Sequence, residues 1–334
     1  MAFYPARLQV VSETRVRTVE FPFERLLGWD VQGGMSSIAD ALEETGVSFD
    51  LPGRESDTTF YASTMYRSIA AATTFSPRFH AVLSEAGRTA AYFGANLQLI
   101  HVGEESAEKR QRIAEGLAQF QLPPETVVHW APGDPATMIC KMALETGSDL
   151  VVAGAVKGEV GGGTGYRPFA NDIARKLIAE APFDLFLFLE PQEARRPLQC
   201  PAVMVDFTET SAEALRRVVQ IAKDRGAEKV FALQVLTTFD EHRLRAAGFE
   251  GDADERLDQF VLDSTPLDVP VETRCIRGNT GFAACELLQD LGADLMVVPT
   301  GMPGRSHPVL SPSLDWLYQV IPCNLWVMRE RTAV

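Results

Sequence analysis

The sequence has a deficit of positive charge and no long apolar run, and each shortage excludes a class of protein. Lys and Arg number 31 against 45 for Asp and Glu, so the formal net charge is −14. Binding to duplex nucleic acid or to a membrane of anionic lipid relies on a basic surface, so we expect neither as a partner. No apolar run approaches the length that crosses a bilayer, and Met1 to Val10 lacks the layout of a signal peptide. We therefore expect a cytoplasmic protein.

The five cysteines and five histidines are too scattered for a disulfide framework or a metal site. No two cysteines form a C-x-x-C pair, and no two histidines have the spacing of ligands on a helix. We expect no metal, and we expect the cysteines to be small buried side chains. No Ser-His-Asp order or paired-carboxylate cleft is recognisable, so no catalytic residue is predicted. The cysteines are Cys140, Cys200, Cys275, Cys285 and Cys323.

The 334 residues suit about two domains, and they contain an internal repeat. In each copy an apolar helical stripe ends at a glycine, Gly94 or Gly226, and an apolar strand follows. An aspartate, Asp149 or Asp294, later precedes another apolar strand, and each copy closes with a Pro and a last apolar strand. The offset between copies grows from 132 residues at the glycines to 145 at the aspartates. Differences in loop length account for this change.

Strands that alternate with helices of about ten to fifteen residues predict right-handed crossovers and a mostly parallel sheet. The expected fold class is α/β, with two tandem five-stranded mostly parallel sheets that carry helices on both faces. We expect the domains to span 58–195 and 196–334, with first strands at Ile69–Thr73 and Val203–Asp206.

Residues 1–57 have no counterpart in the repeat, and we expect an N-terminal extension that packs on one copy. Leu8–Val11 and Arg15–Glu20 predict a hairpin. A short helix is predicted from Ser36 or Ser37 through Glu44.

Each copy carries the same ordered set of short motifs. In the first copy they are His101-Val102, Gly133-Asp134-Pro135-Ala136, Asp149–Gly154 and Ala181-Pro182, and in the second they are Val205-Asp206, Gly278-Asn279, Ala293–Val298 and Pro322-Cys323. This ordered pair resembles a tandem universal stress protein over about residues 58 to 334. The resemblance implies an adenine-nucleotide α-hydrolase-like, Rossmann-type fold.

The family resemblance also implies an internal pseudo-dimer, because the fifth strands of this family pair across a dimer. Both copies here end in bulky apolar strands, Leu185–Phe188 and Leu325–Met328. Open apolar edges favour pairing, so we expect these strands to meet antiparallel within one chain. A further homodimer of chains is an open alternative.

Members of the family that bind ATP carry an acid that closes the first strand and a glycine signature after the fourth. The signature is Gly, two residues, Gly, nine residues, Gly, then Ser or Thr. Glycines let the backbone approach phosphates, and the following helix N-terminus offers unpaired N–H groups. In the first copy Thr73 replaces the acid, and three residues instead of two separate Gly154 from Gly158. A flexible loop is the favoured interpretation there.

The second copy keeps Asp206 and a correctly spaced pair, Gly301 and Gly304, but only six residues then precede Ser311. The alternative is a stiff surface turn in which Ser313 caps a helix. The short loop offers few N–H groups, so the expected ligand is ATP bound weakly, or AMP. The candidate cofactor-binding residues are Asp206, Gly278, Gly301, Gly304, Arg305, Ser311 and Ser313.

The resemblance implies a non-enzymatic stress-response or regulatory protein that binds an adenine nucleotide, mainly in domain 2. Two alternatives remain open. One is a nucleotide-free adaptor that acts through contacts with an unidentified protein partner. The other is an enzyme that transfers adenylyl or phosphoryl groups from ATP, which Asp206 and Arg305 would suit, although no lysine for the phosphates is recognisable.

Overall fold

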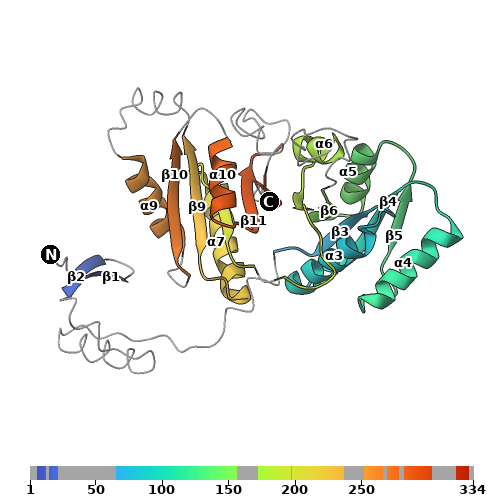
Figure 1. The fold of residues 1–334 in the computed structure, drawn as a ribbon, viewed down its shortest axis with the longest axis horizontal. Coiled ribbons are helices and arrows are strands. Elements are labelled where there is room, and N and C mark those ends of the chain that lie inside the picture. The colour runs from blue at the N-terminus through green and yellow to red at the C-terminus, as the bar shows by residue number, and fades with distance from the viewer. Residues whose placement is uncertain are drawn as a thin grey trace. The chain divides into compact units, whose positions relative to one another are not determined.

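The computed structural model (Figure 1) describes residues 6–12, 15–21, 65–155, 172–196, 198–236, 252–265, 269–277, 282–302 and 321–330. Its contacts divide the chain into two compact units, Met1–Asp57 and Thr58–Val334. In the first unit, β1 (Ala6–Ser12) and β2 (Arg15–Phe21) pair antiparallel, which confirms the predicted hairpin. The helix expected between Ser36 and Glu44 lies outside the described residues, and the packing of the extension on one copy stays a prediction.

In the described residues of the second unit, ten strands form one continuous sheet. The strands are β3 (Ser68–Thr73), β4 (Asn96–Val102), β5 (Val128–Ala131), β6 (Leu150–Gly154), β7 (Asp184–Phe188), β8 (Pro201–Met204), β9 (Val230–Leu236), β10 (Val271–Arg277), β11 (Leu295–Thr300) and β12 (Asn324–Arg329). Their order across the sheet is β10-β9-β8-β11-β12-β7-β6-β3-β4-β5, and every neighbouring pair is parallel except β12 and β7. Each half thus has five parallel strands in the same order, which confirms the predicted fold class.

Helices cover both faces of this sheet, as Figure 1 shows. One face carries α3 (Phe79–Phe93), α4 (Ala107–Gln119), α7 (Glu209–Arg225) and α9 (Ala253–Ser264). The other carries α5 (Pro135–Glu145), α6 (Asp172–Glu180) and α10 (Phe282–Asp290). The equivalent helices α3 and α7 end at Gly94 and Gly226, whose φ angles of 61° and 70° are left-handed. Glycine adopts this conformation at little cost, so both predicted helix ends are confirmed.

The strand pairing determines how the two copies correspond, and it corrects one residue match. The equivalent strands β6 and β11 begin at Leu150 and Leu295. Leu150 pairs with Ile69 of β3, and Leu295 pairs with Pro201 of β8, so Ile69 and Pro201 are equivalent residues. The first strands of the two copies therefore correspond at an offset of 132 residues, and the counterpart of Asp206 is Thr74. The interpretation that Thr73 replaces the acid is wrong. In addition, β8 starts at Pro201 and ends at Met204, so Asp206 lies beyond the strand that was expected to include it.

The same pairing separates the two glycine pairs that spacing alone had matched. Gly154 is opposite Phe188, and Pro299 is opposite Met328 in the equivalent strands. Gly154 thus corresponds to Pro299 and not to Gly301. A Cβ on Gly154 would lie 2.9 Å from Cγ2 of Val82 on α3. This glycine permits close packing of α3 on β6, so its interpretation as a signature glycine equivalent to Gly301 is wrong.

The two halves meet where β7 and β12 pair antiparallel, and this confirms the predicted internal pseudo-dimer. The central pair of the register is Phe186 and Trp326, which occupy equivalent positions 140 residues apart. Their rings stack with 5.8 Å between centroids and 14° between planes. The pseudo-two-fold axis of the unit therefore passes through this pair.

The hydrogen bonds at the two ends of the junction are related by the same pseudo-two-fold axis. The backbone N of Arg329 donates to Oδ1 of Asp184 over 2.7 Å, and the backbone N of Leu189 donates to Oδ1 of Asn324 over 3.1 Å. Donors and acceptors are again 140 residues apart. The hydroxyl of Tyr66 also donates to Asp184, which is buried. A slip in register would leave these buried polar groups without partners, so the bonds fix the alignment of the halves.

We expect Trp326→Ala to lower the free energy of unfolding by about 3–5 kcal/mol, because it leaves a cavity where a large side chain is 1% exposed. A urea titration followed by circular dichroism measures the change. Leu262→Ala is the control, since this apolar side chain is 52% exposed and its loss should change stability by less than about 0.5 kcal/mol. Equal unfolding midpoints for the two variants would contradict the assignment of the junction to the core.

Candidate functional site

The candidate nucleotide site lies at the carboxyl ends of β8 and β11. These strands are adjacent and parallel, so Asp206, which follows β8, and Gly301, which follows β11, lie at the same edge of the sheet. Open α/β sheets bind ligands at this edge. The other predicted site residues, Gly278, Gly304, Arg305, Ser311 and Ser313, lie outside the described residues.

Asp206 belongs to the turn that leads from β8 into α7. Its Oδ1 accepts hydrogen bonds from the backbone N of Thr208 over 3.1 Å and from Oγ1 of the same residue over 2.5 Å. Thr208 in turn caps α7 by accepting from the backbone N of Ser211. Phe207 has a φ of 63°, which a bulky residue adopts only under local strain. The turn therefore holds the Asp206 carboxylate in one position.

The second oxygen of Asp206 can accept a further hydrogen bond. The side chain is exposed, and among the described residues nothing donates to its Oδ2. A carboxylate with one oxygen held by the protein and the other exposed can accept hydrogen bonds from hydroxyl groups of a ligand.

Gly301 leaves open space at the end of β11. Among the described residues, a Cβ built on this residue would meet nothing within 4 Å. The preceding residue, Thr300, is buried, and its Oγ1 accepts a hydrogen bond of 2.8 Å from Nη1 of Arg329. The strand end is thus tied to β12, while the backbone at Gly301 can be approached closely by a ligand.

The corresponding edge of the first half is filled by side chains. Nδ1 of His101 lies 3.1 Å from the carbonyl oxygen of Thr73, and the ring packs against Phe75 and Trp130 at centroid distances of 4.7 and 5.1 Å. Burial lowers the pKa of His101, so the ring is neutral at pH 7. Thr74 places a neutral side chain where the second half has Asp206. The acid and the unobstructed glycine therefore coincide in the second half alone.

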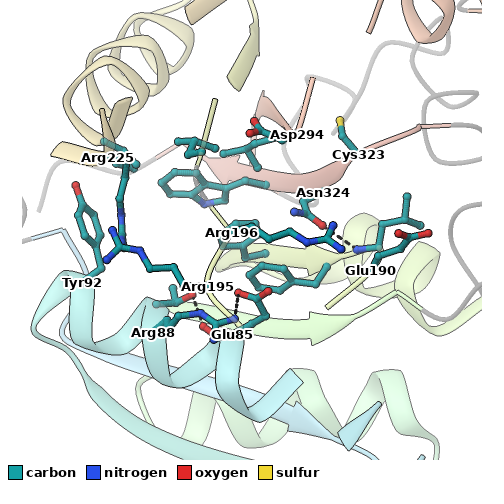
Figure 2. Close-up of a pocket in the computed structure, with 18 of the residues that line it drawn as sticks. Glu85, Arg88, Tyr92, Glu190, Arg195, Arg196, Arg225, Asp294, Cys323 and Asn324 are labelled. Atoms are coloured by element: carbon teal, nitrogen blue, oxygen red, sulfur yellow. Dashed lines mark hydrogen bonds and ion pairs between the residues drawn. The ribbon is translucent and has the colours of Figure 1, made fainter. Parts of the chain in front are cut away.

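A hollow of about 380 Å³, which the sequence did not predict, lies in the face of the sheet that carries α3 and α7. Figure 2 shows Arg88, Arg195, Arg196 and Arg225 around it. These arginines come from α3, from the segment that joins the halves, and from α7. The one local feature of the sequence that could have indicated this hollow is the pair Arg195-Arg196, at the boundary between the copies.

The cysteines are free thiols: Cys285 and Cys323 are buried as expected, whereas Cys140, Cys200 and Cys275 are only partly buried. Burial raises the pKa of Cys285 to about 12, and burial together with a hydrogen bond to Asp254 raises that of Cys275 to about 12. The pKa values of Cys140, Cys200 and Cys323 are also raised, mainly by burial. Within the described ranges, no group of three or more His, Cys, Asp or Glu side chains is placed to hold a metal ion. No helix in those ranges is long and apolar enough to span a membrane.

In the folded protein we expect all five thiols to react slowly with iodoacetamide at pH 8, because a raised pKa leaves little thiolate. For Cys275, Cys285 and Cys323, whose pKa values are raised most, the rate should rise about tenfold per pH unit between pH 8 and 9.5 without a plateau. Mass spectrometry of peptides measures alkylation at each cysteine, and the same protein in urea provides the reference rate. A cysteine that reacts as fast when folded as in urea would contradict this assignment.

Comparison with known proteins agrees with this architecture. Residues 202–329 match the model of the universal stress protein family. A universal stress protein from Archaeoglobus fulgidus is 14% identical, with a TM-score of 0.54 over 78% of this chain and 98% of that chain. A putative universal stress protein from Pseudomonas aeruginosa is 15% identical, with a TM-score of 0.57 over 80% of this chain and 94% of that chain.

A functionally unknown protein from Pseudomonas aeruginosa is similar to the same extent, with 15% identity and a TM-score of 0.56 over 80% of this chain and 94% of that chain. No curated protein matches the sequence. At these identities the solved structures show a shared fold over both halves, and the family match identifies the second half. The second half of the chain, residues 202–329, therefore matches the universal stress protein family.

Proposed function

We propose that this chain is a non-enzymatic cytoplasmic regulator of a stress response that binds an adenine nucleotide at the carboxyl ends of β8 and β11. The observation that carries the proposal is the position of Asp206 beside Gly301, at one edge of the half that matches the family. The resemblance to nucleotide-binding members supplies the class of ligand. Domain 2 is the binding half, because Thr74 in the first half lacks the acid.

Asp206 would recognise the sugar of the nucleotide. Thr208 holds its Oδ1, so the exposed Oδ2 can accept a hydrogen bond from a ribose hydroxyl without first reorganising the turn. The backbone from Gly301 onward would face the phosphates, where N–H groups and the side chain of Arg305 would offset their charge. A net charge of −14 makes each uncompensated phosphate unfavourable, so we expect AMP to bind at least as well as ATP.

Calorimetry with ATP, ADP and AMP tests the proposal. We expect Asp206→Ala to weaken binding by about 10- to 150-fold, the range that corresponds to the loss of a hydrogen bond to a charged group. Thr74→Ala is the matched control, because it changes the equivalent exposed position of the first half, and it should leave affinity unchanged. Gly301→Val should also weaken binding, since it fills the open space at the end of β11.

The same titrations separate the two alternatives. Absence of heat with all three nucleotides would overturn the proposal and favour the nucleotide-free adaptor. Conversion of ATP to AMP or ADP during the titration, detected by chromatography, would favour an adenylyl or phosphoryl transferase. Binding that survives both Asp206→Ala and Gly301→Val would place the nucleotide elsewhere on the chain.

A further inference from the structure

The hollow of Figure 2 results from the way the two halves join. On this face α3 packs over β3, β4 and β6, and α7 packs mainly over β8, β9 and β11 and also contacts β12. The antiparallel junction of β7 and β12 lies between these two sets of strands, and the segment Leu189–Arg196 runs beside it. A cavity of about 380 Å³ remains over the centre of the junction, away from the carboxyl edge that holds Asp206.

Aromatic rings form the apolar part of the lining. Phe186 stacks on Phe188 with 4.4 Å between centroids and 22° between planes, and it stacks on Trp326 from the other side of the junction. Nε1 of Trp326 is buried and has no hydrogen-bond acceptor among the described residues. Buried indole N–H groups normally have an acceptor, so this one is an unsatisfied donor at the centre of the junction.

Arg88 fastens the joining segment to α3. Its guanidinium donates to the backbone oxygens of Gln192 and Glu193, each over 2.6 Å, and forms an ion pair of 2.8 Å with Glu85. This arginine therefore has a structural role that is complete without a ligand. It also positions the residues that follow in the segment, including Arg195.

The other three arginines of the lining have a different environment. In the described parts of the chain, the guanidinium groups of Arg195, Arg196 and Arg225 have neither a hydrogen-bond nor an ion-pair partner. The Cζ atom of Arg225 lies over the ring of Tyr92, 4.5 Å from its centroid. Partial burial, followed by repulsion from Arg195, lowers the pKa of Arg225, and Arg88 adds to the repulsion. Tyr92 and Asp224, which accepts a hydrogen bond from the Tyr92 hydroxyl, act in the opposite direction and offset part of this repulsion.

Two of the acids that line the hollow, Glu85 and Asp294, are held by other groups. Glu85 is paired with Arg88 and also accepts from the backbone N of Gln192 over 3.1 Å. Asp294 accepts from the backbone N of Gln199 and of Cys200, at the start of β8. Glu190 is the remaining acid of the lining. A concentration of arginine in a chain with a net charge of −14 is a local feature and not a property of the surface as a whole.

We propose that this hollow binds a small organic anion, a single carboxylate, sulfonate or phosphate on a flat apolar body. The anionic group lies against Arg195 and Arg225, and the apolar body lies against Phe186 and Trp326. The joining segment and both halves contribute to this site, so binding also stabilises their arrangement. The site is distinct from the nucleotide edge and does not depend on the proposed function.

The test uses two fluorescent probes that share their rings. The probe 1-anilinonaphthalene-8-sulfonate carries an anion, and N-phenyl-1-naphthylamine is the same ring system without it. We expect the full chain to bind the sulfonate at least about tenfold more tightly, because only the sulfonate can accept charge-assisted hydrogen bonds from the guanidinium groups. Equal affinity for the two probes would overturn the proposal. This comparison uses the wild-type protein and requires no variant.

Substitutions then locate the bound anion. Arg195→Met combined with Arg225→Met should weaken sulfonate binding by about tenfold or more and leave the neutral probe unchanged. The control is Arg216→Met, which removes a charge from the same helix, α7, where Arg216 is paired with Glu209 and Glu213. If Arg216→Met lost as much affinity for the sulfonate, the effect would be one of net charge, and the proposed site would be wrong.

A single variant and a competition experiment test the site further. Arg195 is exposed, so Arg195→Met alone should fold as the wild type does, which circular dichroism checks, and it should still weaken sulfonate binding severalfold. Saturating AMP should leave the sulfonate bound in both the wild type and Asp206→Ala. The proposal of a separate anion site would be overturned if both Arg195→Met and the double variant bound the sulfonate as the wild type does. Displacement of the sulfonate by AMP would also overturn it.

Discussion

The antiparallel pairing of β7 with β12 is the constraint on which the rest of the second unit depends. Each half alone would end in an open apolar strand, and such edges associate with other strands. Pairing within the chain removes both edges, stacks Phe186 on Trp326 and aligns the polar ends through Asp184 and Asn324. The ten-stranded sheet, the symmetry of the halves and the hollow above the junction all follow from this contact.

Much of the fold could be predicted from the sequence because its signals are local. A helical stripe that ends at glycine predicted the ends of α3 and α7, and apolar strands after a Pro predicted the junction. The errors came from register, which spacing along the chain does not determine. Thr73 was matched to Asp206 although the ladder assigns Thr74, and Gly154 was matched to Gly301 although it packs against Val82.

The two sites differ in how much the sequence could reveal. Asp206 and Gly301 each follow a strand, and adjacent parallel strands bring their ends together, so topology alone predicted their proximity. The hollow is lined by Arg88, the Arg195-Arg196 doublet and Arg225, which lie on three separate segments and meet because the halves pair antiparallel. Its existence depends on the space between α3 and α7, and no short sequence pattern encodes that space.

The central claim, that two halves form one sheet through β7 and β12, is tested most directly by amide hydrogen exchange in the native protein. The account predicts that backbone amides of β7 and β12 exchange among the slowest of the chain, by unfolding of the whole unit, while the outer strands β5 and β10 exchange faster through local opening. If the halves were independent, β7 and β12 would be edge strands. Exchange in β7 and β12 as fast as in β5 and β10 would contradict the account.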